Sequence, residues 1–237
     1  MNLNRQIEDW IKSRISQFDA PSRPFVTLAY AQSLDGSISS KIGEPLVLSG
    51  EEASCLTHQL RSLHDGILVG IETVLADNPQ LTVRMWEGEN PQPIVLDSLL
   101  RMPETARLCN HPDKKCWVMT ARKMENLPER GFEILPVGEG EDARVPLNEA
   151  LRVLHNKGIT SIMVEGGATV ITAFLEAGLV DAVVMTIAPA IVGGYKAVNK
   201  LNIDINGQIP IVDPLNSEMF GKDIIVWGDV QFEGKES

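Results

Sequence analysis

A short segment of the sequence gathers side chains that suit a sugar phosphate. In GIETVLADNPQLTVR (residues 70–84), Thr73 and Asp77 are four residues apart, so they share one face if the segment is helical. A hydroxyl and a carboxylate on one face suit hydrogen bonding to ribose or amide groups. Asn78 begins an Asn-Pro turn, and Arg84 adds a positive charge. The alternative is local, because Asp and Asn also cap and turn the backbone.

A second segment, SIMVEGGATVITAFLEAG (residues 161–178), combines an apolar strand, a Gly-Gly pair and a helix. Glu165 closes the strand, at the end where open α/β sheets bind ligands. The helix N-terminus behind the glycines favours an anion. The alternative is a strand-to-helix turn that merely needs glycine. The backbone N–H groups predicted to meet the anion belong to Gly166, Gly167, Ala168 and Thr169.

Arg61 is a third candidate, on the flank of a predicted helix in SGEEASCLTHQLRSLH (residues 49–64). From there it is able to reach over a neighbouring strand end toward Arg84. Two guanidinium groups that converge on a phosphate make charge-assisted, bidentate contacts. Each arginine taken alone is equally consistent with a surface position.

The elements that must position these side chains follow from the apolar pattern. Ser49 and Glu52 form a capping-box pattern at the start of the 49–64 helix. Strands alternating with helices, then strands alone at the end, predict a three-layer α/β fold whose mixed sheet has flanking helices and an antiparallel C-terminal edge. The other predicted helices are 1–20 (amphipathic), 146–158 and 166–178. The predicted strands are 25–31, 66–70, 93–97, 116–120, 132–137, 161–165, 182–189, 209–215 and 223–229.

Composition narrows the possible partners. The 237 residues, 43% of them hydrophobic, suit one domain at 24–229, preceded by the helix at 1–20 and followed by a tail at 230–237. The net charge of -11, without basic runs, disfavours nucleic acid and an anionic membrane surface. Three cysteines without a C-x-x-C pair indicate reduced thiols and a cytoplasmic protein. Four scattered histidines offer no metal-ligand spacing, so no metal site is expected.

Five motifs in order carry a family resemblance. They are PFVTLAYAQSLDGSIS, LTHQLRSLHDGILVGIETVLADNPQLTVR, PIVLDSLLRMP, IMVEGGATVITAFLEAGLVD and IAPAIVGG. Together they resemble the pyrimidine reductases of riboflavin biosynthesis over residues 24–229. That family comprises stand-alone fungal and archaeal reductases and the C-terminal half of the bacterial bifunctional deaminase-reductase.

The resemblance implies a dihydrofolate-reductase-like fold, NADPH as cofactor and a homodimer. The implied oxidoreductase converts the ribosylamino side chain of a diamino- or amino-pyrimidine 5′-phosphate to the ribitylamino form. The zinc deaminase signature is missing from the sequence, so a separate deaminase is expected to act in the same pathway. Two alternatives stay open: a reductase of a related pterin or pyrimidine in another pathway, or a non-catalytic subunit that binds a nucleotide and a sugar phosphate.

The resemblance also implies roles for individual residues. Asp77 and Glu165 are the candidates for proton transfer, although binding of substrate hydroxyls is the simpler role for either residue. The family commonly has glycine where Glu72 stands, which places an extra carboxylate near the cofactor. For the 2′-phosphate of the cofactor, position alone makes Ser98 with Arg101, or Thr120 with Arg122 and Lys123, the candidates, and each cluster is equally consistent with a solvated loop. The residues implied for NADPH are Ala31, Thr73, Asp77, Ser98 and the 166–169 turn, and those implied for the substrate are Arg61, Leu81, Arg84 and Glu165.

Overall fold

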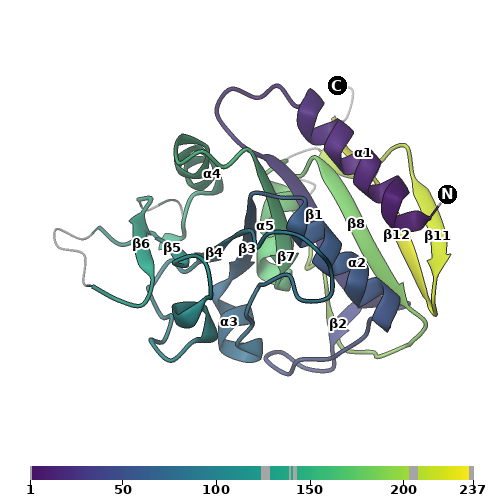
Figure 1. The fold of residues 1–237 in the computed structure, drawn as a ribbon, viewed down its shortest axis with the longest axis horizontal. Helices are drawn as coiled ribbons and strands as arrows, with labels where there is room; N and C mark the ends of the chain where they lie inside the picture. The colour runs from purple at the N-terminus through teal and green to yellow at the C-terminus, as the bar shows by residue number, and fades with distance from the viewer. Residues whose placement is uncertain (1, 124–128, 139, 141–142, 203–207, 235–237) are drawn as a thin grey trace.

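The computed structural model describes residues 2–123, 129–138, 140, 143–202 and 208–234, which form a twisted central sheet with helices on both faces (Figure 1). The strands are β1 (Phe25–Ser33), β2 (Ser37–Ser39), β3 (Gly66–Gly70), β4 (Gln92–Leu96), β5 (Trp117–Thr120), β6 (Glu133–Pro136), β7 (Ser161–Gly166), β8 (Ala182–Ala188), β9 (Tyr195–Lys196), β10 (Gln208–Val212), β11 (Asn216–Phe220) and β12 (Asp223–Gly234). The helices are α1 (Leu3–Gln17), α2 (Glu51–Ser62), α3 (Ile71–Asp77), α4 (Leu147–Asn156) and α5 (Ala168–Glu176), with a 3-10 turn η1 (Arg107–Asn110).

The sheet has a parallel centre and an antiparallel edge. Its order is β10-β12-β8-β1-β7-β3-β4-β5-β6, and β11 pairs with β12 beside β10. All the pairs from β8 to β6 are parallel, whereas β12 is antiparallel to β8, β10 and β11. The carboxyl ends of the parallel strands therefore lie along one edge of the sheet. The predicted three-layer mixed α/β fold is confirmed.

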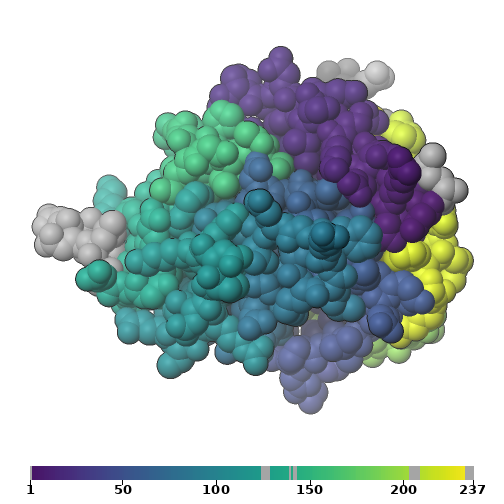
Figure 2. Space-filling model, viewed as in Figure 1, coloured from purple at the N-terminus to yellow at the C-terminus, as the bar shows by residue number. Residues whose placement is uncertain are grey.

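Alternation along β1 separates the two layers of core. Val26 and Leu28 pack with α4 and α5 on one face, whereas Phe25 and Ala29 pack with α1 and α2 on the other. Figure 2 shows α1 (purple) and blue to teal segments over the middle of this second face, with β11 and β12 (yellow) visible at its edge.

The predicted N-terminal helix is present as α1, and it is held by apolar burial. Ile7 and Ile11 have no exposed surface and contact the second core. Each such side chain contributes about 1.5–3 kcal/mol. The exposed Arg5–Asp9 pair on the same helix contributes at most about 1 kcal/mol, so burial decides where α1 packs.

Three sequence predictions need correction. The capping box is wrong: α2 begins at Glu51 with Gly50 as its N-cap, because the Gly50 N–H donates to Asp223 Oδ2 at 2.6 Å and ties the helix start to the β11–β12 hairpin. The predicted 209–215 strand ends at Val212, and β11 follows as a separate strand. The tail was expected to begin at residue 230, but β12 continues to Gly234 because it pairs with β10. Residues 235–237 lie outside the described residues.

Candidate active site

The loops after β3 and β7 flank the point where the connections of the sheet diverge. These two strands are neighbours, but α3 leads from β3 to β4 while α5 leads from β7 past β1 to β8. Connections that leave in opposite directions open a crevice at the carboxyl ends of the strands, which is where such sheets bind ligands. The predicted glycine corner and the predicted threonine-aspartate helix therefore begin at the carboxyl ends of two neighbouring strands.

Gly167 makes the contact between these two segments. It is the N-cap of α5 with φ +81°, and a Cβ atom added to it would lie 3.1 Å from Thr73 Oγ1. Across the same junction, a Cβ atom added to Gly70 would lie 2.7 Å from Val170 Cγ2. The Gly-Gly corner and the start of α3 therefore lie side by side.

The first turn of α5 suits an anion. A Cβ atom added to Gly166 would have no neighbour within 4 Å, so open space lies in front of the helix N-terminus. The first N–H groups of a helix have no acceptor within the helix, and they carry the positive end of its dipole. The backbone from Gly166 to Thr169 therefore fits a phosphate-containing cofactor, with Thr169 exposed at the same turn.

A bulge in β7 directs Glu165 out of the regular strand. Leu68 pairs with Val164, whereas Val69 pairs with Gly166, so Glu165 is the extra residue between two successive pairs. A bulge of this kind bends the strand and re-aims the side chain of the extra residue. It leaves the Glu165 carboxylate directed at Arg61 of α2.

Glu165 and Arg61 form a bidentate ion pair. Arg61 Nε donates to Glu165 Oε1 at 2.8 Å, and Nη2 donates to Oε2 at 2.7 Å. Arg61 Nη1 donates to the Thr82 carbonyl at 2.9 Å. The two charged side chains are only 12% and 14% exposed. In this arrangement the guanidinium of Arg61 is directed at Glu165 and Thr82.

Arg84 approaches the same place from the loop after α3. Its Nη1 donates to Thr82 Oγ1 at 2.9 Å and to Gln80 Oε1 at 3.3 Å. Arg61 and Arg84 therefore converge on Thr82, one at its carbonyl and the other at its hydroxyl. Arg84 itself is exposed, so its remaining donors are open to a ligand from solution.

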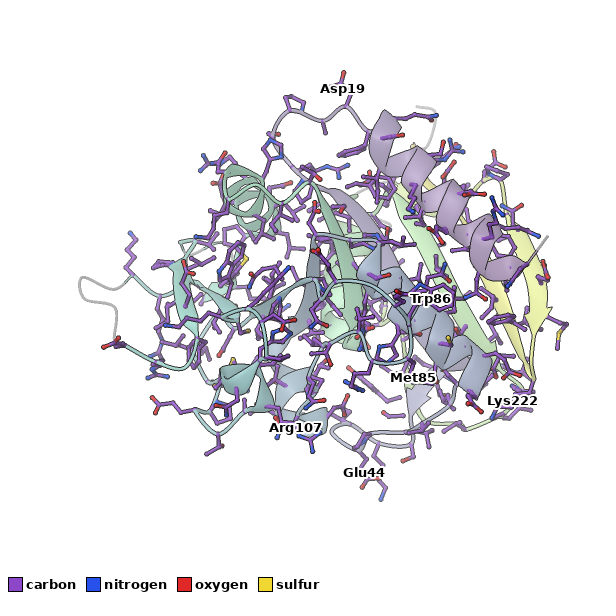
Figure 3. The ribbon with its side chains drawn as sticks, in the orientation of Figure 1. Asp19, Glu44, Met85, Trp86, Arg107 and Lys222 are labelled. Carbon is purple, nitrogen blue, oxygen red and sulfur yellow. The ribbon has the colours of Figure 1, made fainter. Side chains whose placement is uncertain are left out.

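The other predicted residues near α3 play different parts. Asn78 ends α3 in the left-handed conformation, with φ +44°, and its Oδ1 accepts the N–H of Arg107 at 2.8 Å, so it turns the backbone as the local interpretation requires (Figure 3 labels Arg107). Asp77 is exposed at the helix end, yet the surrounding protein removes part of its water and raises the pKa of its carboxyl group. Leu81 has φ +55° and is 1% exposed, with its side chain in the core under α3.

The remaining cofactor candidates lie at the ends of β1 and β4. Ala31 is half-buried and pairs with Thr186 of β8. Ser98 follows β4, and its Oγ accepts the N–H of Val145 at 3.0 Å. Beyond it, Arg101 forms an ion pair with Glu72 at the start of α3. The carboxylate of Glu72 thus pairs with Arg101, one of the residues considered for contact with the 2′-phosphate.

His58 is a site residue that the sequence analysis did not single out. It is 5% exposed, and its Nδ1 accepts the backbone N–H of Arg84 at 3.1 Å. Burial, reinforced by the positive charges of Arg61 and Arg84, lowers its pKa to about 4. The sequence feature that could have identified His58 is its spacing, because it lies three residues before Arg61 and so on the same face of α2.

Asp35 is a second residue that was missed, and it joins the end of β1 to the loop after β8. Its carboxylate accepts hydrogen bonds from Ser33 and Ser37, from the N–H groups of Val192 and Gly193, and from Lys196 Nζ at 2.7 Å. The Lys196 hydrogen bond is the main reason that the pKa of Asp35 is held well below its usual range. This network joins the turn after β1 to the segment after β8.

Metal sites and membrane-spanning helices are both absent from the described ranges. Within them, no three His, Cys, Asp or Glu side chains are grouped closely enough to hold a metal ion. Of the helices in the same ranges, none has both the length and the apolar character needed to cross a bilayer.

Comparisons with known proteins agree with the motifs. A family model described as the RibD C-terminal domain matches residues 24–226. The 2,5-diamino-6-ribosylamino-4(3H)-pyrimidinone 5′-phosphate reductase of Methanothermobacter thermautotrophicus is 39% identical over 215 residues, covering 86% of this chain and 97% of the relative. Riboflavin biosynthesis protein RibD of Bacillus amyloliquefaciens is 35% identical over 201 residues, covering 82% of this chain and 53% of the relative, about half its length. The solved structure of a riboflavin biosynthesis reductase from Saccharomyces cerevisiae has a TM-score of 0.80 at 26% identity and covers 98% of this chain and 100% of that one.

Proposed function

Because the chain belongs to the RibD C-terminal domain family, we propose that it reduces the ribosylamino side chain of a (di)aminopyrimidine 5′-phosphate to the ribitylamino form in riboflavin biosynthesis. The archaeal relative that aligns over nearly its whole length is named as a reductase of such a compound, the diaminopyrimidinone 5′-phosphate. The amino-uracil counterpart differs by one exocyclic group and belongs to the same proposal.

The observation that carries the proposal is the close approach of two segments at the carboxyl ends of β3 and β7. On one side Gly167 meets Thr73 in front of the open N-terminus of α5. Immediately beside this corner, the bulged Glu165 leads through Arg61 to Arg84. An anion cradle built from backbone N–H groups and a charged side-chain array are thus adjacent, as a reaction between a dinucleotide and a sugar phosphate requires.

NADPH is proposed for the side lined by Ala31, Thr73, Asp77, Ser98 and the 166–169 turn. The bound cofactor would supply hydride for the reduction. The chain itself contributes the N–H groups of α5 for a phosphate, the Thr73 hydroxyl for a polar group and the apolar Ala31 at the end of β1. The glycines allow the close approach, because side chains there would fill the space that a phosphate needs.

The substrate is proposed to lie against Glu165, Leu81 and Arg84. Arg84 is exposed and has unused donors for a phosphate. Glu165 keeps oxygen lone pairs beyond the two that Arg61 engages, so it is able to accept from a ribose hydroxyl or a ring amine. Because Leu81 is buried, its contact would come from the backbone. Asp77 is the better candidate for proton transfer, since its raised pKa favours the protonated form.

Absorbance of the reduced nicotinamide tests this proposal directly. The protein is mixed with NADPH and the ribosylaminopyrimidine phosphate, and the product is identified by mass. Oxidation of NADPH with formation of the ribitylamino product supports the proposal. Oxidation only with pterins would assign the chain to a related reductase, and cofactor binding without turnover would make it a binding subunit.

Three further properties belong to the same proposal. The chain acts as a cytoplasmic homodimer, and deamination is carried out by a separate protein of the pathway. Light scattering of the purified chain measures whether it is a dimer. A deamination assay with the phosphorylated pyrimidine measures whether the chain itself lacks deaminase activity.

A further inference from the structure

One face of α2 holds the backbone of the loop that carries Arg84. The Cys55 thiol donates to the carbonyl of Met85 at 3.1 Å, and His58 Nδ1 accepts the N–H of Arg84 at 3.1 Å. Arg61 Nη1 donates to the Thr82 carbonyl at 2.9 Å. The three side chains are spaced three residues apart, so they form one row along the helix. Figure 3 labels Met85 beside α2, where this row begins.

The loop needs these contacts because it has no sheet partner. Residues 78–91 contain no helix or strand, although the loop supplies Arg84, the arginine proposed to bind the phosphate. Backbone groups that leave water must find partners in side chains. The row on α2 provides partners for three residues between Thr82 and Met85, and His58 is its central member.

His58 is suited to this task only in its neutral form. Because the Arg84 N–H donates to Nδ1, the ring proton must reside on Nε2. Arg61 and Arg84 both place positive charge near the ring, and burial adds to their effect. A neutral acceptor is therefore retained beneath two cations, where any protonated group would lose the hydrogen bond and be repelled.

We propose that His58 is a positioning residue for the substrate phosphate, because it fixes the backbone from which the Arg84 guanidinium reaches that phosphate. This inference rests on the proposed function, in which Arg84 binds the phosphate. His58 itself does not contact the ligand. The neighbouring members of the row differ: Arg61 is committed to Glu165, and a thiol is only a weak donor.

The matched variants follow from the geometry. His58→Leu removes the acceptor while filling much of the space. His58→Asn restores an acceptor, since its Oδ1 occupies nearly the position of Nδ1. His64→Asn is the control: His64 is also 5% exposed, but its ring contacts Thr27 and the Leu60 carbonyl instead of the loop.

The experiment compares the phosphorylated substrate with its dephosphorylated counterpart, using the full chain and NADPH. For His58→Leu we expect KM for the phosphorylated substrate to rise about tenfold, equivalent to about 1.4 kcal/mol. Its kcat, and its KM for the dephosphorylated compound, should stay within about twofold of the unmodified protein. His58→Asn should recover most of the lost affinity, and His64→Asn should leave the ratio of the two KM values unchanged.

The results separate this inference from the proposed function. An equal rise in both KM values for His58→Leu indicates a general structural defect and overturns the inference. If Arg84→Ala abolishes the preference for phosphate but His58→Leu keeps it, the inference fails while the proposed function stands. If neither compound is reduced, the proposed function fails, and binding of ribose 5-phosphate decides the inference: weakening in both variants supports it, and unchanged binding in His58→Leu overturns it.

Discussion

The ion pair between Arg61 and Glu165 is open to a quantitative test. Two charge-assisted hydrogen bonds of 2.8 and 2.7 Å join side chains that are 12% and 14% exposed, and a third bond holds the Thr82 carbonyl. Arg61→Ala leaves a nearly buried carboxylate and a carbonyl without their partner, which costs about 3–5 kcal/mol of unfolding free energy. Glu165→Ala costs less, because the remaining guanidinium keeps its bond to Thr82.

A double-mutant cycle isolates the pairwise energy. Urea unfolding followed by circular dichroism gives the free energy of unfolding for the unmodified chain, the two alanine variants and the double variant. Groups in direct contact couple by about 0.5–3 kcal/mol, and this bidentate pair belongs in the upper half of that range. The variant Arg61→Met with Glu165→Leu should be within about 1 kcal/mol of the unmodified protein, since apolar residues often replace buried ion pairs without loss. It should nevertheless lack turnover, because the substrate loses the Glu165 carboxylate.

A coupling energy near zero would refute this reasoning. It would mean that the Arg61 side chain does not pair with Glu165 when the protein is in solution. The sequence pattern alone suggests this, because it assigns both arginines to the phosphate. In that case ribose 5-phosphate should stabilise the unmodified chain and fail to stabilise Arg61→Ala. With the pair formed, Arg84→Ala should remove that stabilisation instead.

Other perturbations test the crevice and the buried histidine separately. Gly167→Ala puts a Cβ atom at φ +81° against Thr73 of α3, so it should lower the unfolding free energy by about 1–2 kcal/mol and weaken NADPH binding in a fluorescence titration. Gly158→Ala is the control, because Gly158 has φ +87° and open space around it. It should cost similar stability and leave NADPH binding unchanged. Glu72→Gly releases Arg101 and should raise the preference for NADPH over NADH several-fold, as measured by the two KM values; no change would place the 2′-phosphate elsewhere. Burial lowers the pKa of His64 to about 4, so as the pH falls this histidine takes up a proton in the unfolded chain before it does in the folded one. The unfolding free energy should therefore fall by up to about 3 kcal/mol between pH 6.5 and 4. A His64→Gln variant whose stability depends on pH just as steeply would contradict this.

Sequence patterns recovered the parts of the fold that depend on neighbours in the chain. Apolar runs such as GILVG and SIMVE became β3 and β7, and Gly158 and Gly178 follow the helices that they were expected to end. β11 was missed because its residues are mostly exposed and show no apolar alternation. The capping box failed because the actual partner of the helix start, Asp223, is 173 residues away.

The site shows the same division. The Gly-Gly corner was identifiable, since a strand that runs into glycines and a helix is a local pattern. The partner of Arg61 was not, because Glu165 is 104 residues away and its direction depends on a bulge. A bulge appears only when the register of β3 against β7 is known. His58 was passed over because an isolated histidine gains meaning only from the loop packed on it.

The location of the charges explains how an acidic chain can serve two anionic ligands. With a net charge of -11, the protein repels anions at long range, so attraction must be local. At the glycine corner we propose that it comes from backbone N–H groups and the dipole of α5, which add no net charge. At the other end Arg61 is neutralised by Glu165, which leaves Arg84 as the cation exposed to solvent within this array. A neutral His58 beside Arg84 adds no competing charge, and its Nδ1 accepts the backbone N–H of that arginine.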